Sequence, residues 1–207
     1  MIARLNSVAF RGIQAEPVEV EVDIASRGFA AATVVGLPDA AVKESLERVR
    51  SAMHNSGYDF PRYKTVVNLA PADLKKEGPV FDLPIALGII FASGTVVPEL
   101  TPSYLVTGEL ALDGRVRSMR GALSVALLVK AMGLRGLLLP AENAEEAAVV
   151  DDVEIVPITT LTDAVGFLSG QLPIDPVYVD PLEALKKMSH YDTDFSDVRG
   201  QDHVKRA

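Results

Sequence analysis

The feature that most constrains this fold is a run of apolar residues near the middle of the chain. Residues 66–70 read VVNLA, and residues 83–92 are apolar apart from Gly88. A helix that is apolar on all sides belongs in a protein core, and this one is too short to cross a bilayer, which takes about 20 residues. The run predicts a strand buried on both faces, a polar loop over 71–79, and a core helix with Asp82 as its N-cap.

Acidic residues are concentrated late in the chain, so the net charge of −8 hides two regions. Residues 1–140 contain 15 Lys and Arg against 14 Asp and Glu, whereas residues 141–183 contain ten acids and no base. The acidic segment is either a solvated surface or one that repels nucleic acid and leaves binding to the first 140 residues. The absence of cysteine excludes disulfides, and three scattered histidines predict no metal site. The N-terminus has no long apolar run, which predicts a cytoplasmic protein without a signal peptide.

Strands and helices are predicted along the rest of the chain. Strands are expected over residues 3–10, 17–24, 30–35, 64–70, 136–139 and 153–156, and helices over 37–57, 122–132, 143–149 and 161–169. Three strands in succession indicate an antiparallel start, and the later alternation of helix and strand favours parallel pairing. Asp39 is the expected N-cap of the first helix.

A hairpin is predicted over residues 101–121, with Asp113 and Gly114 as a two-residue turn. Arg115, Arg117 and Arg120 follow that turn. They either hold a phosphate or form a charged edge that prevents strand pairing between molecules.

The sequence contains no recognisable catalytic set. No Ser, Thr or Cys occurs between residues 70 and 92, and no glycine-rich loop ends in Lys-Ser or Lys-Thr. No serine lies in a nucleophile-elbow motif. The clustered carboxylates Asp73, Glu77 and Asp82 are explained by helix capping and loop solvation.

Three blocks of sequence resemble known families. Residues 108–140, GELALDGRVRSMRGALSVALLVKAMGLRGLLLP, resemble the hairpin, helix and strand of the Lon protease domain. Residues 77–88, EGPVFDLPIALG, occupy the place where that family carries its serine nucleophile. Residues 36–52, GLPDAAVKESLERVRSA, resemble the N-terminal domain of the ComM/YifB family, AAA+ ATPases related to the magnesium-chelatase ATPase subunit. The resemblance implies an α+β, Lon-protease-like domain with a mixed β-sheet and packed helices.

The resemblance also assigns roles to positions. The serine place falls on Val80 or Phe81 and the lysine place on Leu123, all apolar, so no peptidase activity is expected. It divides the chain into a Lon-protease-like domain over 1–170, a linker over 171–191 and the start of an AAA+ module over 192–207. In that module Val198, Gly200 and Gln201 would lie on the adenine side of a nucleotide site.

By the same resemblance, the full-length protein would bind ATP and Mg²⁺, form a hexameric ring and drive DNA branch migration in recombination during natural transformation. This fragment would hold no cofactor, and its domain would support ring assembly or engage DNA. The alternatives are a degenerate Ser-Lys peptidase with residual proteolysis and a chelatase-type subunit for metal insertion. The candidate nucleic-acid contacts are Arg48, Arg50, Arg62, Lys64, Lys75, Lys76, Arg115, Arg117 and Arg120.

Overall fold

A long antiparallel hairpin opens the fold. The computed structural model describes residues 2–180, beginning with β1 (Ile2–Arg11) and β2 (Gln14–Ile24). The alternation predicted for β2 is confirmed, because Val18, Val20 and Val22 are buried between polar neighbours. The hairpin supplies the two central strands on which the main helices pack.

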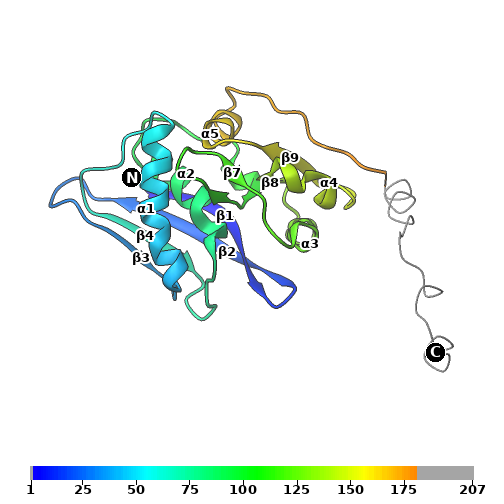
Figure 1. Cartoon of the computed structure of the whole chain (residues 1–207), viewed down its shortest axis with the longest axis horizontal. Helices are drawn as coiled ribbons and strands as arrows, with labels where there is room; N and C mark the ends of the chain where they lie inside the picture. Colours follow the sequence, from blue (N-terminus) through cyan, green and yellow to red (C-terminus); the bar gives the residue numbers. More distant parts are fainter. Residues whose placement is uncertain (1, 181–207) are drawn as a thin grey trace, which may run out of the picture.

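Seven strands form a mixed sheet in the order β3-β4-β2-β1-β5-β8-β9 across the described part of the chain (Figure 1). The strands added to the hairpin are β3 (Ala32–Val35), β4 (Thr65–Ala70), β5 (Tyr104–Val106), β8 (Gly136–Pro140) and β9 (Glu154–Ile158). The parallel pairing predicted for the later strands is confirmed in β8 and β9. Strand β5, predicted as part of a hairpin, also pairs in parallel with β8. The antiparallel start is right for two strands and wrong for the third, since β3 lies at the sheet edge and runs parallel to β4.

Helices pack on both faces of this sheet. Helices α1 (Ala40–Asn55), α2 (Asp82–Ala92) and α5 (Leu161–Leu168) share one apolar cluster, and α3 (Ala122–Met132) and α4 (Ala144–Ala147) share the other. Single turns of 3₁₀ helix occur at Pro79–Phe81, Thr101–Ser103 and Ala141–Asn143. The α+β, mixed-sheet architecture expected from the sequence is confirmed. No helix within residues 2–180 is long and apolar enough to span a membrane.

The central helix α2 is buried along its whole length, as its sequence predicts. Gly88 has a packing reason, because a Cβ there would lie 2.6 Å from the side chain of Val22. The prediction that β4 is covered on both faces is wrong: Val67 and Leu69 are buried, but Val66 and Asn68 are only half-buried. On the second face α3 contacts β8 and β2 and α4 contacts β9, which leaves β4 partly open there.

The predicted hairpin over 101–121 is shorter than its sequence indicates. Its paired strands are β6 (Glu109–Leu110) and β7 (Val116–Arg117), whereas β5 joins the main sheet. The connection is a five-residue loop over 111–115 and not a two-residue turn, with the Ala111 amide donating to the Arg115 carbonyl at 2.8 Å. Gly114 in this loop has a φ of +87°, and a Cβ there would lie 2.2 Å from Ser56 Oγ. The hairpin is therefore anchored close to the end of α1.

Residues 171–180 run beside β9, at the edge of the sheet opposite to β3. The Val177 amide donates to the Ile155 carbonyl of β9 at 2.8 Å, and Val177 and Val179 pack against the cluster around α3.

Candidate functional site

A buried lysine lies in the loop over 71–78 that joins β4 to the segment before α2. The Lys76 side chain has no exposed surface, and its ammonium group donates to the Pro71 carbonyl. Burial lowers the pKa of Lys76, although the charge of Asp73 offsets part of that effect. Its backbone forms a parallel bridge with Pro38, so the loop is fixed against the start of α1. Lys76 is one of the candidate nucleic-acid contacts predicted from the sequence, but its burial excludes it from an exposed basic surface.

The place that the Lon resemblance assigns to a serine is apolar and rigidly held. Phe81 is fully buried and Val80 is half-buried. The Val80 carbonyl accepts hydrogen bonds from the Gly108 amide at 3.0 Å and from the buried Thr107 hydroxyl at 3.4 Å. The Leu83 amide in turn donates to the Gly108 carbonyl at 3.0 Å. The segment is bonded on both sides to the chain entering the hairpin and presents no nucleophile.

The place assigned to the lysine base is also apolar. Leu123 lies in the first turn of α3 with 40% of its side chain exposed, and its amide donates to a Glu146 carboxylate oxygen at 3.2 Å. An alkyl side chain cannot accept a proton from a hydroxyl. The geometry therefore offers no Ser-Lys pair at these positions.

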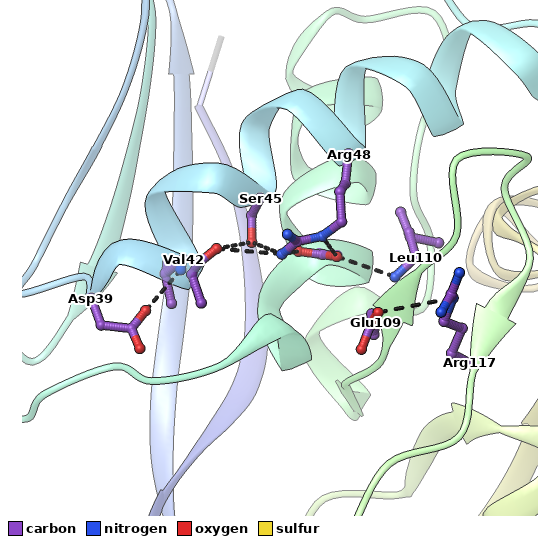
Figure 2. A network of polar contacts seen from close by, with 9 residues as sticks. Asp39, Val42, Ser45, Arg48, Glu109, Leu110 and Arg117 are labelled. Carbon is purple, nitrogen blue, oxygen red and sulfur yellow. Dashed lines mark hydrogen bonds and ion pairs between the residues drawn. The ribbon is translucent and has the colours of Figure 1, made fainter.

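The polar centre of this region is instead an ion pair between Arg48 of α1 and Asp82 at the start of α2. Figure 2 shows the Arg48 side chain reaching from α1 toward Leu110, with Ser45 on the same helix. Asp82 is completely buried and accepts from Arg48 Nε at 2.8 Å and Nη2 at 3.1 Å, and from the Leu110 amide at 3.3 Å. Arg48 Nη2 also donates to the Ser45 hydroxyl and the Ala41 carbonyl. The hydrogen bonds to Asp82 raise the pKa of the Arg48 guanidinium despite its partial burial.

Two expectations change with this pair. Asp82 is not the N-cap of α2, since that position is Phe81 and Asp82 is the first residue of the helix. Arg48, with only 24% of its side chain exposed, is committed to an internal carboxylate and is not an open phosphate contact. By contrast, the capping role of Asp39 is confirmed, because its carboxylate accepts from the Val42 amide at 2.8 Å.

This arrangement of α1, the 71–83 segment and the hairpin coincides with a known family domain. The family described as subunit ChlI of Mg-chelatase matches residues 20–143, which include both partners of the Arg48–Asp82 pair. The chain belongs to this ChlI family. Helices α1 and α2 and the hairpin all lie within the matched residues.

Individual relatives agree with that assignment. The chain is 41% identical to the competence protein ComM of Haemophilus influenzae over its full length, covering 40% of that protein. It is 38% identical to the uncharacterized protein YifB of Escherichia coli over 98% of its length, covering 39% of that protein. It is 26% identical to the Lon protease of Rhizobium meliloti over 72% of its length, covering 20% of that protein. The chain thus spans about 40% of its ComM and YifB relatives.

In this ChlI-family chain the three hairpin arginines do not form a free cationic cluster. Arg115 pairs with Asp113 at 2.8 Å, and Arg117 lies 3.9 Å from Glu109. Hydrogen bonds from the Arg115 amide and guanidinium hold the pKa of the Asp113 carboxyl below its usual range. Arg120 is exposed and has no ion pair within the described residues. An open hollow of about 430 Å³ beside β7 is lined by Ala111, Arg115, Val116, Arg117, Ser118, Glu142 and Thr159.

The remaining basic candidates belong to other elements than the hairpin. Lys75 is exposed and paired with Glu77, a contact that raises the pKa of Lys75. Arg50 stacks its guanidinium 4.4 Å from the centroid of the Phe60 ring. Arg62 and Lys64 are exposed just before β4. The candidates therefore form several separate groups, and sequence alone did not distinguish paired cations from unpaired ones.

No cluster of three or more His, Asp or Glu side chains that could hold a metal ion is found within residues 2–180. Val198, Gly200 and Gln201, expected at a nucleotide site, lie outside the described residues.

Two aromatic residues of interest were missed by the sequence analysis. Phe29 is 94% exposed and Tyr63 is 47% exposed, in the loops just before β3 and β4 respectively. Both follow an exposed cation closely: the sequence reads Arg27-Gly28-Phe29 and Arg62-Tyr63-Lys64. That interleaving of cations and aromatics was the available signal, but exposure could not be deduced from it.

Proposed function

We propose that this chain is the non-catalytic N-terminal domain of a magnesium-chelatase-like AAA+ ATPase. We further propose that the full-length protein is a hexameric, cytoplasmic, ATP-dependent branch-migration helicase for DNA in recombination and natural transformation. Membership of the ChlI family and the 41% identity to a competence protein support this proposal. ATP and Mg²⁺ would bind in the AAA+ module, with Val198, Gly200 and Gln201 on the adenine side.

The observation that supports a non-catalytic role is the set of side chains at residues 80–83. Val80 and Phe81, the two positions that the resemblance offers for the nucleophile, carry apolar side chains, and the adjacent Asp82 is paired with Arg48. A carboxylate held by three hydrogen bonds and shielded from solvent is not available to activate water or a substrate. The domain therefore contributes through binding, either by supporting ring assembly or by engaging DNA.

Electrostatics favour the first 140 residues for DNA engagement. The net negative charge of the chain comes from residues 141–183, which contain no Lys or Arg. Exposed cations without an ion pair in the described part of the chain include Arg27, Arg62, Lys64 and Arg120. Neutralising phosphates with such cations releases counterions, which makes the affinity fall steeply with salt.

The proposal is tested in two steps. The 207-residue chain should bind single-stranded or branched DNA weakly, with an affinity that falls steeply with salt, in fluorescence anisotropy. The full-length protein should hydrolyse ATP and move a synthetic four-way junction, and deletion of residues 1–170 should impair junction movement or ring formation. ATP hydrolysis without any junction movement would refute the helicase role. Unchanged movement and unchanged ring size after the deletion would refute the role of this domain.

The second candidate function is metal insertion, which the family description favours. A chelatase-type full-length protein would promote Mg²⁺ insertion into a tetrapyrrole in an ATP-dependent way. Measuring that insertion spectroscopically, next to junction movement, separates the two functions because each assay reports on a different product.

The peptidase alternative receives its own test. We expect no turnover of fluorescent casein by the chain. Turnover that a change of Phe81 or Leu123 abolishes would show that the domain retains a catalytic site.

A further inference from the structure

Two loops meet at one end of the sheet, where β2 ends and where β3 and β4 begin. The first covers residues 25–31 and the second residues 56–64. The Ala25 amide donates to the Lys64 carbonyl at 2.9 Å, and the Thr65 amide donates to the Ala31 carbonyl at 2.7 Å. In Figure 1 both loops lie at the left end of the molecule, beyond the ends of these strands. Segments separated by about 35 residues in sequence are therefore fixed side by side.

This end of the molecule combines exposed aromatic rings with exposed cations. We call it the basic–aromatic end and define it by Arg27, Phe29, Arg62, Tyr63 and Lys64. Phe29 is among the most exposed large apolar side chains described, at 94%. Because single exposed apolar residues are common on protein surfaces, the informative feature is their position among cations.

Backbone hydrogen bonding between the two loops keeps Phe29 and Tyr63 close to each other. Phe29 lies two residues before Ala31, and Tyr63 lies two residues before Thr65. Ala31 and Thr65 are joined by the 2.7 Å hydrogen bond. An extended chain covers at most about 3.5 Å per residue, so two residues on either side of that hydrogen bond separate the two aromatic residues only slightly. One short oligonucleotide can therefore reach both rings.

The charge at this end is not neutralised by ion pairs. Within residues 2–180, none of Arg27, Arg62 and Lys64 has an acidic partner, in contrast to Lys75 and to two of the hairpin arginines. The acids closest in the chain are Asp23 on β2 and Asp59 in the second loop, both exposed. Arg50 adds a fourth cation, which packs on Phe60 in the same loop. Cations thus outnumber acids here, although the chain as a whole is acidic.

We propose that the basic–aromatic end binds single-stranded DNA, with bases stacked on Phe29 and Tyr63 and phosphates beside Arg27, Arg62 and Lys64. This proposal rests on the DNA-engaging role proposed above and assigns that role to one surface. Exposed aromatic rings stack on unpaired bases of any sequence, and flanking cations follow the backbone. Paired bases in a duplex do not present their faces to such rings, so a duplex would gain only the phosphate contacts.

The test measures binding of the 207-residue chain to a labelled oligothymidylate of about 20 nucleotides and to a duplex of equal length, by anisotropy at several salt concentrations. Phe29→Ala and Tyr63→Ala should each weaken single-strand binding about tenfold without changing the salt slope. Tyr63→Phe should retain the affinity because it keeps the ring. Arg62→Ala should reduce the slope of log K against log salt by about 0.7.

Matched controls lie elsewhere on the molecule. Ile13→Ala removes a side chain that is 91% exposed at the far end of the β1–β2 hairpin. Lys130→Ala removes an exposed cation of α3 that pairs with Asp152. Both variants should bind like wild type. Circular dichroism of every variant checks that the fold is retained.

The outcomes separate this proposal from the broader function. Equal binding of strand and duplex, or unchanged affinity in both aromatic variants, would overturn the assignment to this surface. If affinity is then lost in Arg115→Ala, Arg117→Ala and Arg120→Ala together, DNA engagement stands but belongs to the hairpin. If wild type binds no oligonucleotide even at low salt, the DNA-engaging role fails together with the surface, and ring assembly remains.

Discussion

Removing Arg48 is the perturbation whose cost the structure defines most clearly. Asp82 has no exposed surface, and Arg48 supplies two of its three hydrogen bonds, at 2.8 and 3.1 Å. Arg48→Met keeps a side chain of similar length but leaves the Asp82 carboxylate with only the Leu110 amide, at 3.3 Å. A buried charge that loses its partner is not compensated by water, so the folded state bears the desolvation cost.

The magnitude follows from the unequal burial of the two partners. Breaking a buried pair costs about 3–5 kcal/mol, and because 24% of the Arg48 side chain reaches solvent we expect about 3 kcal/mol. Asp82→Asn should cost less, about 1–2 kcal/mol, since Arg48 can turn part of its guanidinium toward water. The double change Arg48→Met with Asp82→Leu should recover most of the loss, because no buried charge remains.

Urea unfolding followed by circular dichroism measures these free energies. Arg4→Met is the matched control: Arg4 pairs with Glu21 at 3.0 Å, but 63% of the Arg4 side chain is exposed. We expect it to cost less than about 1 kcal/mol. If Arg48→Met is as mild as this control, or if the double change is no more stable than Arg48→Met alone, the ion pair does not hold α1 and α2 together.

Three further changes test other parts of the fold, each by urea unfolding. Gly36→Ala should cost more than about 2 kcal/mol, because its Cβ would lie 2.1 Å from a carbonyl oxygen of β4; Gly12→Ala, also at positive φ but in open space, should cost only about 1 kcal/mol. Burial lowers the pKa of Lys76, so the unfolded chain binds more protons than the folded chain between that lowered pKa and about 10.4. The free energy of unfolding of the wild type should therefore rise with pH in this range. Lys76→Met should lack that rise, and Lys75→Met should retain it. Ser7→Ala should leave stability unchanged or raise it by about 1 kcal/mol, since the buried Ser7 hydroxyl has no hydrogen-bond partner among the described residues; a loss beyond about 1 kcal/mol would contradict this.

Much of the fold could be predicted from local pattern. The apolar run gave α2, the valine alternation gave β2, and Asp39 marked the start of α1. Strand order could not be read in the same way, because pairing joins segments far apart in the chain. The edge position of β3, parallel to β4, depends on α1 crossing between them.

The buried charges were the main error at the candidate site. Asp82 precedes an apolar helix, which fits an N-cap as well as an internal ion pair, and its partner lies 34 residues earlier on α1. Lys76 follows Lys75 in a polar loop, and the sequence does not indicate that only Lys75 is exposed. In both cases tertiary contacts decided the burial.

These buried charges explain why binding chemistry is expected at the periphery of this domain. The 71–83 segment is fixed at several points: Lys76 to Pro71, the Gly78 amide to Asp39 at 3.3 Å, and Asp82 to Arg48. Each contact satisfies a polar group internally, so these buried groups are not available to a ligand. The unpaired cations at the basic–aromatic end lie instead in loops beyond the strand ends. A ligand can therefore bind there without breaking the polar network that joins α1 to α2, and variants of the two regions should affect DNA affinity and stability separately.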